Sequence, residues 1–177
     1  LVAVRLSAQC TDARVNLVTP ALFEKYKTLD DYCSADVRDI EKIIYSCGFY
    51  KSKAKSIIDM AKGVRERFGG IVPDSIDDLI TLNGVGRKTA NLIVGDIYHK
   101  QAIVVDTHMI RIANRIGLVC EKDPKKIELA LKKLIPAEES SDFCHRIVLF
   151  GRDTCPARKP KCDGCPMDFN CKKIGVK

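Results

Sequence analysis

Helical hydrophobic periodicity runs through most of this chain and limits it to one fold class. From Ala54 to Phe68 apolar side chains recur every three or four residues, and Gly69-Gly70 ends the pattern. The same spacing predicts helices over 37–44 and about 87–98, 107–117, 124–135 and 141–150. Only residues 102–105 resemble a strand, and one strand makes no sheet. We therefore expect an all-α fold.

Several polar residues have predicted places in these helices. Ser75 and Asp78 have the spacing of a capping box, and Asp123 precedes Pro124 as a cap should. The helix that ends at Phe68 should carry its basic side chains on faces away from the core. These are Lys53, Lys55, Lys62 and Arg65.

The start of the chain is apolar from Leu1 to Leu6 but has no charged lead-in of the kind a signal peptide carries. It resembles the middle of a buried helix, so we expect a fragment that lacks its natural start. No apolar run reaches the roughly 18–20 residues of a membrane span, and none is expected to cross a membrane.

The nine cysteines fall into two groups. Four lie within residues 155–171, and the other five are dispersed through helical patterns, where buried reduced thiols are common. An odd count with one tight group indicates one metal site in a reducing compartment rather than a secreted disulfide scaffold. The dispersed cysteines are Cys10, Cys33, Cys47, Cys120 and Cys144.

The four grouped cysteines are separated by six, two and five residues in a tail without a helical stripe. Four thiolates suit zinc or a [4Fe–4S] cluster, and this spacing favours the cluster without excluding zinc. A metal there would be at least a structural staple for a tail with little core. These cysteines are Cys155, Cys162, Cys165 and Cys171.

Basic residues surround the cysteine group, and the whole chain carries a formal charge of +7. A positive surface suits contact with a phosphate backbone, whereas local neutralisation of an anionic cluster explains any single one of these residues equally well. They are Arg152, Arg158, Lys159, Lys161, Lys172 and Lys173, of which Lys161 is our candidate for DNA contact.

Residues 82–90 form a second motif, a hairpin between two helical patterns. Gly84 and Gly86 allow a tight turn, and Arg87 and Lys88 begin the following helix. Backbone N–H groups of the hairpin and of that helix's first turn can then face a phosphate. The motif is a helix–hairpin–helix, which grips a DNA backbone without reading its sequence. The predicted DNA contacts here are Gly84, Val85, Gly86 and Arg87.

Lys88 is out of place at a helix N-terminus, because its charge opposes the helix dipole. A solvated or phosphate-contacting lysine is the simple interpretation. The alternative is an amine whose positive charge is destabilised by the dipole and by partial burial, so that it can act as a nucleophile.

Asp106 lies between the apolar run 102–105 and the next predicted helix. An aspartate at that place is an ordinary N-cap. The alternative is a catalytic carboxylate, which the motifs on either side of it favour.

Four stretches occur together in the order found in the endonuclease III family, and the chain resembles that family over essentially its whole length. They are residues 6–12 (Leu-Ser-Ala-Gln-x-Thr-Asp), the hairpin 84–91, the run 105–108 (Val-Asp-Thr-His) and the cysteine loop. The resemblance implies a six-helix barrel with a helix–hairpin–helix at about 1–100 and a [4Fe–4S] cluster domain at about 101–177, without the family's first helix.

The resemblance also implies a function. The chain should be a base-excision repair enzyme, a bifunctional DNA N-glycosylase and AP lyase that releases oxidised or saturated pyrimidines from double-stranded DNA. Lys88 matches the Schiff-base lysine, Asp106 the catalytic aspartate and the four cysteines the ligands of the [4Fe–4S] cofactor. Gln9 and the loop 48–51, with Phe49 and Tyr50, match elements that enter the duplex where a base has left. We expect a monomer that acts at the nucleoid in the cytoplasm.

Two positions depart from the family's pattern. Asn83 replaces a common proline, and we expect it to tolerate left-handed geometry in a less rigid turn. Phe49 replaces a smaller aliphatic residue, which could alter the preference for damage.

Three other functions compete with this interpretation. A monofunctional adenine or mismatched-thymine glycosylase of the same fold would lack a lysine at the position of Lys88. A DNA-binding module without activity would not need Asp106 within its motif. An electron carrier would not need the hairpin.

Overall fold

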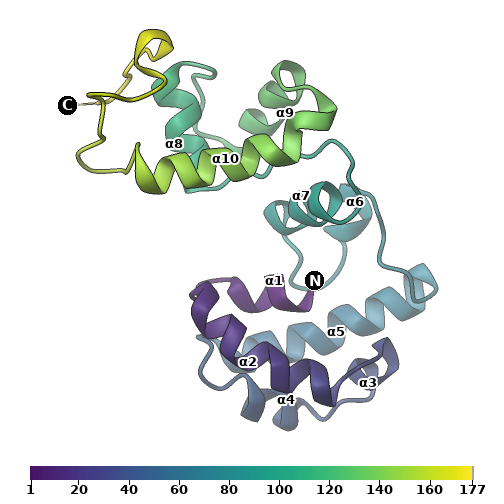
Figure 1. Cartoon of the computed structure of the whole chain (residues 1–177). Helices are drawn as coiled ribbons and strands as arrows, with labels where there is room; N and C mark the ends of the chain where they lie inside the picture. Colours follow the sequence, from purple (N-terminus) through teal and green to yellow (C-terminus); the bar gives the residue numbers. More distant parts are fainter. Residues whose placement is uncertain (177) are drawn as a thin grey trace. The chain divides into compact units, whose positions relative to one another are not determined.

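The computed structural model describes residues 1–176, and all of their regular elements are helices (Figure 1). The all-α prediction is confirmed. By compactness the chain divides into two units, Leu1–Ala90 and a second from Asn91 onward. This division is no test of the predicted domains, 1–100 and 101–177, which stay a prediction. None of the helices within residues 1–176 has the length and apolar character of a membrane span.

The first unit packs its helices around a core of aliphatic and aromatic side chains that includes Leu22, Ile40, Ile44 and Ile57. Helix α5 is the longest and contacts α1, α3 and α4. The helices are α1 (Val2–Ser7), α2 (Asp12–Lys25), α3 (Leu29–Cys33), α4 (Val37–Ile43), α5 (Tyr50–Phe68), α6 (Ile76–Leu79) and the start of α7 (Arg87–Asp96).

Several details of this unit differ from the prediction. Helix α2 was missed, because Pro20 interrupts a sequence whose buried positions, Val15, Val18 and Leu22, still follow helical spacing. Most of the run 1–6 is helical as expected, in α1, but only Leu6 of that helix is buried. Ser75 caps α6 through the Asp78 N–H (3.1 Å), whereas the Ser75 hydroxyl donates to the Asp78 carboxylate (2.7 Å), so the cap is not the reciprocal box.

The second unit has its own core, in which Ile103, Met109, Ile112, Ile127 and Leu131 are fully buried. It contains the rest of α7, then α8 (Thr107–Ile116), α9 (Pro124–Leu134), a short 3₁₀ turn (Ala137–Glu139) and α10 (Ser140–Asp153). The tail that follows has one further 3₁₀ turn, Asp168–Asn170.

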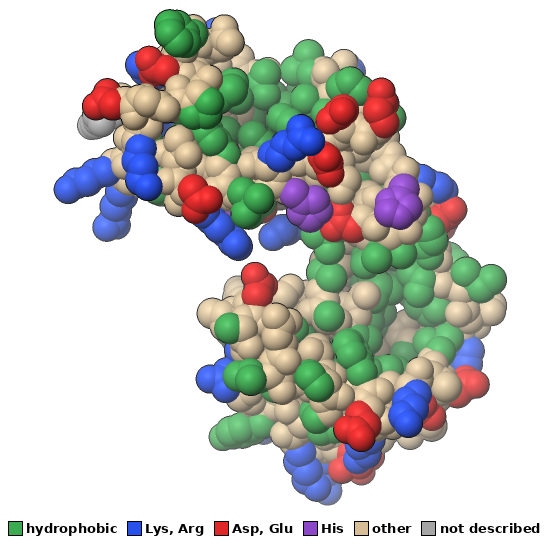
Figure 2. Space-filling model, in the orientation of Figure 1, with side chains coloured by type: hydrophobic (Ala, Val, Ile, Leu, Met, Phe, Trp, Pro, Cys, Tyr) green, Lys and Arg blue, Asp and Glu red, His purple; other side chains and the backbone are tan. Residues whose placement is uncertain are grey.

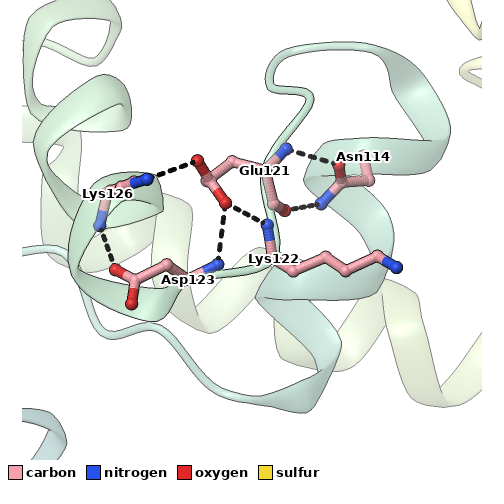
Figure 3. A network of polar contacts seen from close by, with 5 residues as sticks. All are labelled: Asn114, Glu121, Lys122, Asp123 and Lys126. Carbon is pink, nitrogen blue, oxygen red and sulfur yellow. Dashed lines mark hydrogen bonds and ion pairs between the residues drawn. The ribbon is translucent and has the colours of Figure 1, made fainter.

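A polar network fixes the connection from α8 to α9 (Figure 3). The Asn114 side-chain amide donates to the Glu121 carbonyl and accepts from the Glu121 N–H. The Glu121 carboxylate accepts from the Lys122 and Asp123 N–H groups. These N–H bonds, Asp123 first, lower the pKa of Glu121. Asp123 caps α9 through the Lys126 N–H (2.9 Å), which confirms the predicted cap.

Residues 102–105 form no strand, because side chains rather than a second strand satisfy their backbone. The Ala102 N–H donates to Ser140 Oγ, the Ile103 N–H to Asn91 Oδ1, and the Val104 N–H to Cys144 Sγ. The run is thereby an extended connection into α8, and it brings Asp106 to the start of that helix.

Candidate nucleic-acid interface and catalytic residues

The hairpin of the first unit turns at Gly84, whose φ is +76°. A Cβ at Gly84 would collide with Ser56 Oγ and come within 2.7 Å of Arg5 Nε, so a glycine is required. Arg5 Nε donates to Ser56 Oγ (2.8 Å), whose hydroxyl donates to the Asn83 carbonyl (3.4 Å). The hairpin is therefore tied to α1 and α5.

The two hairpin glycines have different surroundings. A Cβ at Gly86 would meet no atom within 4 Å, so nothing in the described residues requires a glycine there. The tolerance of Asn83 for left-handed geometry is not used here, because Gly84 provides the positive φ. The Asn83 side chain instead reaches Asp59 Oδ2 at 3.5 Å.

Val85 differs from its predicted role. Its side chain is buried, and its N–H donates to the Leu82 carbonyl at 3.1 Å. That N–H faces the hairpin itself and cannot face a phosphate. Contact of a phosphate with the first turn of α7 stays a prediction.

Lys88 lies in the first turn of α7, directly after the hairpin, and its side chain is exposed. The first turn of α7 holds no acidic residue, and no ion pair among residues 1–176 engages the Lys88 ammonium. This exposure agrees with the simple interpretation of a solvated lysine, and the partial burial that the nucleophile alternative invoked is not seen.

Asp106 lies in the second unit as the N-cap of α8, half-buried, with Oδ1 accepting from the Met109 N–H at 2.8 Å. The cap interpretation is thus correct. This bond uses one carboxylate oxygen, so a cap and a catalytic role are compatible in the same side chain.

Gln9 and Phe49 of the first unit share an unusual backbone conformation. Their φ angles are +52° and +57°, and both side chains are exposed. Non-glycine residues in the left-handed region are uncommon and concentrate at functional sites. The two turns are neighbours, since a Cβ on Gly48 would lie 3.4 Å from the Gln9 carbonyl oxygen.

We had predicted Tyr50 in the loop 48–51, but in the structure it is the first residue of α5. Its side chain is half-buried against the core of the first unit, and its ring lies 4.9 Å from that of Tyr45. The structure gives Tyr50 a packing contact, whereas Phe49 beside it is 68% exposed.

The four clustered cysteines line one cavity at the end of the second unit. All nine cysteines are free thiols, and among residues 1–176 no three His, Cys, Asp or Glu side chains are arranged to hold a single metal ion. Of the dispersed cysteines, Cys33, Cys47 and Cys144 are buried as expected, but Cys10 is only partly buried and Cys120 is exposed.

Two arginines of α8 organise the cysteine loop, and the sequence pattern did not reveal them. Arg111 donates to the Cys155 carbonyl, and the buried Arg115 donates to Cys155 Sγ (3.3 Å) and to the Pro156 and Ala157 carbonyls. The Arg115 carbonyl accepts from Cys171 Sγ (3.6 Å). Their spacing of four residues on one helix face is the signal that could have identified them.

The surface of the tail is rich in basic side chains, with acidic ones among them (Figure 2). Lys161 is exposed, and its N–H donates to the Thr154 carbonyl at 2.9 Å. Lys173 pairs with Asp168 (2.6 Å) and is therefore partly neutralised.

A family model described as "HhH-GPD superfamily base excision DNA repair protein" matches residues 2–137. The chain belongs to this superfamily. It is 44% identical to endonuclease III of Bacillus subtilis (strain 168) over 98% of this chain and 80% of that protein. Endonuclease III of Escherichia coli (strain K12) is 38% identical over 97% of this chain and 82% of that protein.

Solved structures agree with this assignment. A trapped endonuclease III–DNA covalent intermediate matches with a TM-score of 0.88 at 43% identity, over 97% of this chain and 81% of that one. A thermostable thymine-DNA glycosylase has a TM-score of 0.87 but 27% identity over the same shares. The predicted endonuclease III type is confirmed, and with it the base-excision repair activity of a DNA glycosylase and lyase.

Proposed function

We propose that this protein acts on oxidised or saturated pyrimidines in double-stranded DNA, with Lys88 as the nucleophile and Asp106 as the supporting carboxylate. The observation that carries the proposal is the position of Lys88. An exposed amine directly follows the hairpin, opposes its helix dipole and has no acidic partner among residues 1–176, so packing does not account for it. A solved relative is described as a covalent endonuclease III–DNA intermediate, which fits an amine nucleophile.

The chemistry follows from these two side chains. A paired base is unreachable, so the nucleotide rotates out of the stack at a cost of a few kcal/mol. The Lys88 amine attacks C1′ while the glycosidic bond breaks and the base leaves with a proton. The Asp106 carboxylate stabilises the positive charge that develops on the sugar. The C1′–O4′ bond then breaks, so that the sugar ring opens, O4′ takes a proton and an iminium joins C1′ to the Lys88 nitrogen. This iminium makes a C2′ proton acidic, and β-elimination removes that proton and breaks the C3′–O bond, with the 3′ phosphate as the leaving group.

The remaining DNA contacts are divided between backbone and base positions. The open backbone at Gly86, the α7 first turn with Arg87, and Lys161 on the tail are suited to phosphates, which carry no sequence information. Gln9 and Phe49 are suited to the space left by the rotated nucleotide, because both are exposed and held in left-handed conformations.

The cysteine loop is suited to a [4Fe–4S] cluster, the cofactor that the family resemblance implies. Four thiols that surround one cavity match the one thiolate per iron that such a cluster takes. Arg115 adds an N–H donor to Cys155 Sγ, the kind of contact that tunes a cluster. When bound, the cluster supplies a cross-link for the tail, and the nine free thiols suit a reducing compartment such as the cytoplasm.

Borohydride trapping on duplexes with different damaged bases tests the function. We expect a covalent complex with oxidised or saturated pyrimidines and none with an undamaged duplex. If none of the damaged bases gave a covalent complex, or if the strand were cleaved without any trapping, the proposal would be contradicted.

Metal analysis tests the cofactor independently of activity. We expect a brown protein with about four irons per chain. One equivalent of zinc without iron would contradict it. Cys162→Ser should reduce soluble yield more than Cys120→Ser, because Cys120 lies outside the loop.

Salt dependence tests the phosphate contacts. Affinity for undamaged duplex should fall steeply with salt, and Lys161→Glu should weaken binding to all sequences alike. The matched variant Lys62→Glu, on exposed α5 surface, should have a smaller effect. A changed choice of lesion in Lys161→Glu would contradict a backbone contact.

A further inference from the structure

Lys53 is a buried cation in the first unit that the proposed chemistry does not use. We had expected it on a polar face of α5, but its side chain is 1% exposed and lies against the core. Its ammonium donates to the carbonyl of Leu6 at 2.8 Å, across 47 positions of sequence. A buried ammonium is costly, so its position needs a specific reason.

Two hydrogen bonds make Lys53 a link between the turns of Gln9 and Phe49. Its backbone N–H donates to the Phe49 carbonyl (3.0 Å) as the first bond of α5. Its side chain holds the last turn of α1, three residues before Gln9. The carbonyl end of a helix attracts a cation, which offsets part of the burial cost.

The two turns also touch each other directly. The position of a Cβ on Gly48 lies 3.4 Å from the Gln9 carbonyl oxygen, and Cys10 packs against the core cluster that contains Cys47. The residue that precedes Phe49 therefore lies against the backbone of Gln9. The turns of Gln9 and Phe49 are therefore connected both by this direct contact and by the two hydrogen bonds of Lys53.

We propose that Lys53 is a positioning residue that holds Gln9 and Phe49 at a fixed separation, so that both enter the duplex together when a nucleotide rotates out. This inference rests on the proposed function, because it assumes that these two side chains replace the departed nucleotide. It adds a residue that never touches the DNA. A misplacement of about 1 Å can cost roughly a hundredfold in rate, so the loss of such an anchor has a measurable effect.

The test compares two duplexes with the same oxidised pyrimidine. In one the lesion is paired with a normal base, and in the other it faces an abasic analogue, where no base pair must be broken. Lys53→Met keeps the length and volume but removes the ammonium. We expect excision from the paired duplex to fall about tenfold to a hundredfold, with less than about a threefold change on the second duplex.

Lys55→Met is the matched control, since Lys55 is exposed on the same helix and should leave both rates unchanged. Equal losses on both duplexes would indicate a merely structural role and overturn the proposal, as would no loss on either. If wild-type protein excised the lesion from neither duplex, the proposed function itself would fail, which is a distinct result.

Two further variants keep the test decisive if Lys53→Met does not fold. Gly48→Val should press on the Gln9 carbonyl and lower the same ratio of rates without removing a charge. Lys53→Met in a Phe49→Ala background should add little, because the positioned side chain is already gone. An unchanged ratio in Gly48→Val, or independent multiplicative losses in the double variant, would overturn the inference.

Discussion

The N-terminal ends of α7 and α8 carry the two proposed catalytic residues in opposite physical situations. Asp106 is half-buried at the N-cap of α8, where its carboxylate accepts a backbone N–H and its charge suits the helix dipole. Lys88 is exposed in the first turn of α7, where the same dipole opposes its charge and where that turn holds no acidic residue to compensate. The fold therefore accounts for Asp106 but not for Lys88.

This contrast separates two kinds of functional signal. Lys88 is informative because local energetics do not explain it, so a substitution there should change chemistry and leave stability intact. Asp106 has a structural contact as well, so substitutions there should affect both. The predictions below test this separation, beginning with the largest effect.

Lys88→Gln should abolish covalent trapping and β-elimination, a loss of about three orders of magnitude or more, because no amine remains to attack C1′. Binding to damaged duplex and the melting temperature should be unchanged. Trapping assays with binding and melting curves measure all three, with Lys62→Gln as the exposed control. Retained trapping would mean that another amine is the nucleophile.

Asp106→Asn should reduce base release by about a hundredfold or more, because the carboxylate charge at the sugar is lost. Cleavage of a pre-formed abasic site should survive far better than in Lys88→Gln, since the amine can reach an aldehyde without help from Asp106. Single-turnover rates on the two substrates measure the difference. Equal losses on both substrates would require Asp106 to act in the elimination as well.

Substitutions at the two hairpin glycines, Gly84 and Gly86, should separate an effect on stability from an effect on DNA binding. Gly84→Ala should destabilise the protein by about 2–3 kcal/mol, because its φ is positive and its Cβ would collide with Ser56 Oγ. Gly86→Ala should leave stability nearly unchanged but weaken DNA binding, because its Cβ enters open space that suits a phosphate. Denaturant unfolding and duplex affinity measure both. Equal destabilisation by the two variants would remove the distinction.

The cap of α8 should give the smallest effect. Asp106→Ala should lower the free energy of unfolding by about 1 kcal/mol, whereas Asp106→Asn should change it by less, because asparagine is also a good cap. Asp123→Ala, which removes the corresponding cap of α9, is the control and should cost a similar amount without affecting base release. Chemical denaturation measures each. An Asp106→Ala variant as stable as wild type would show that the cap contributes little.

Local patterns were sufficient for the elements that depend on nearest neighbours. The caps at Asp106 and Asp123 and the end of α5 at Gly69 all depend on residues within a few positions of each other. Periodicity was less reliable where a local breaker stood within a helix, so α2 was missed at Pro20. Periodicity also placed the start of α5 at Ala54, whereas the helix begins at Tyr50, because its polar first turn shows no apolar stripe.

The sequence by itself determined the all-α class, the hairpin, the cysteine group and the identity of the two catalytic candidates, because periodicity, glycine spacing and motif order do not depend on which distant residues come into contact. Only the tertiary structure decided that Lys53 is buried, that Gln9 and Phe49 are neighbours, and that Arg115 holds the cysteine loop. Each of these depends on a partner distant in sequence: Leu6 for Lys53, Gly48 for Gln9 and Cys155 for Arg115. Whether a charged side chain is buried is set by the atoms that surround it, and folding supplies those atoms from elsewhere in the chain.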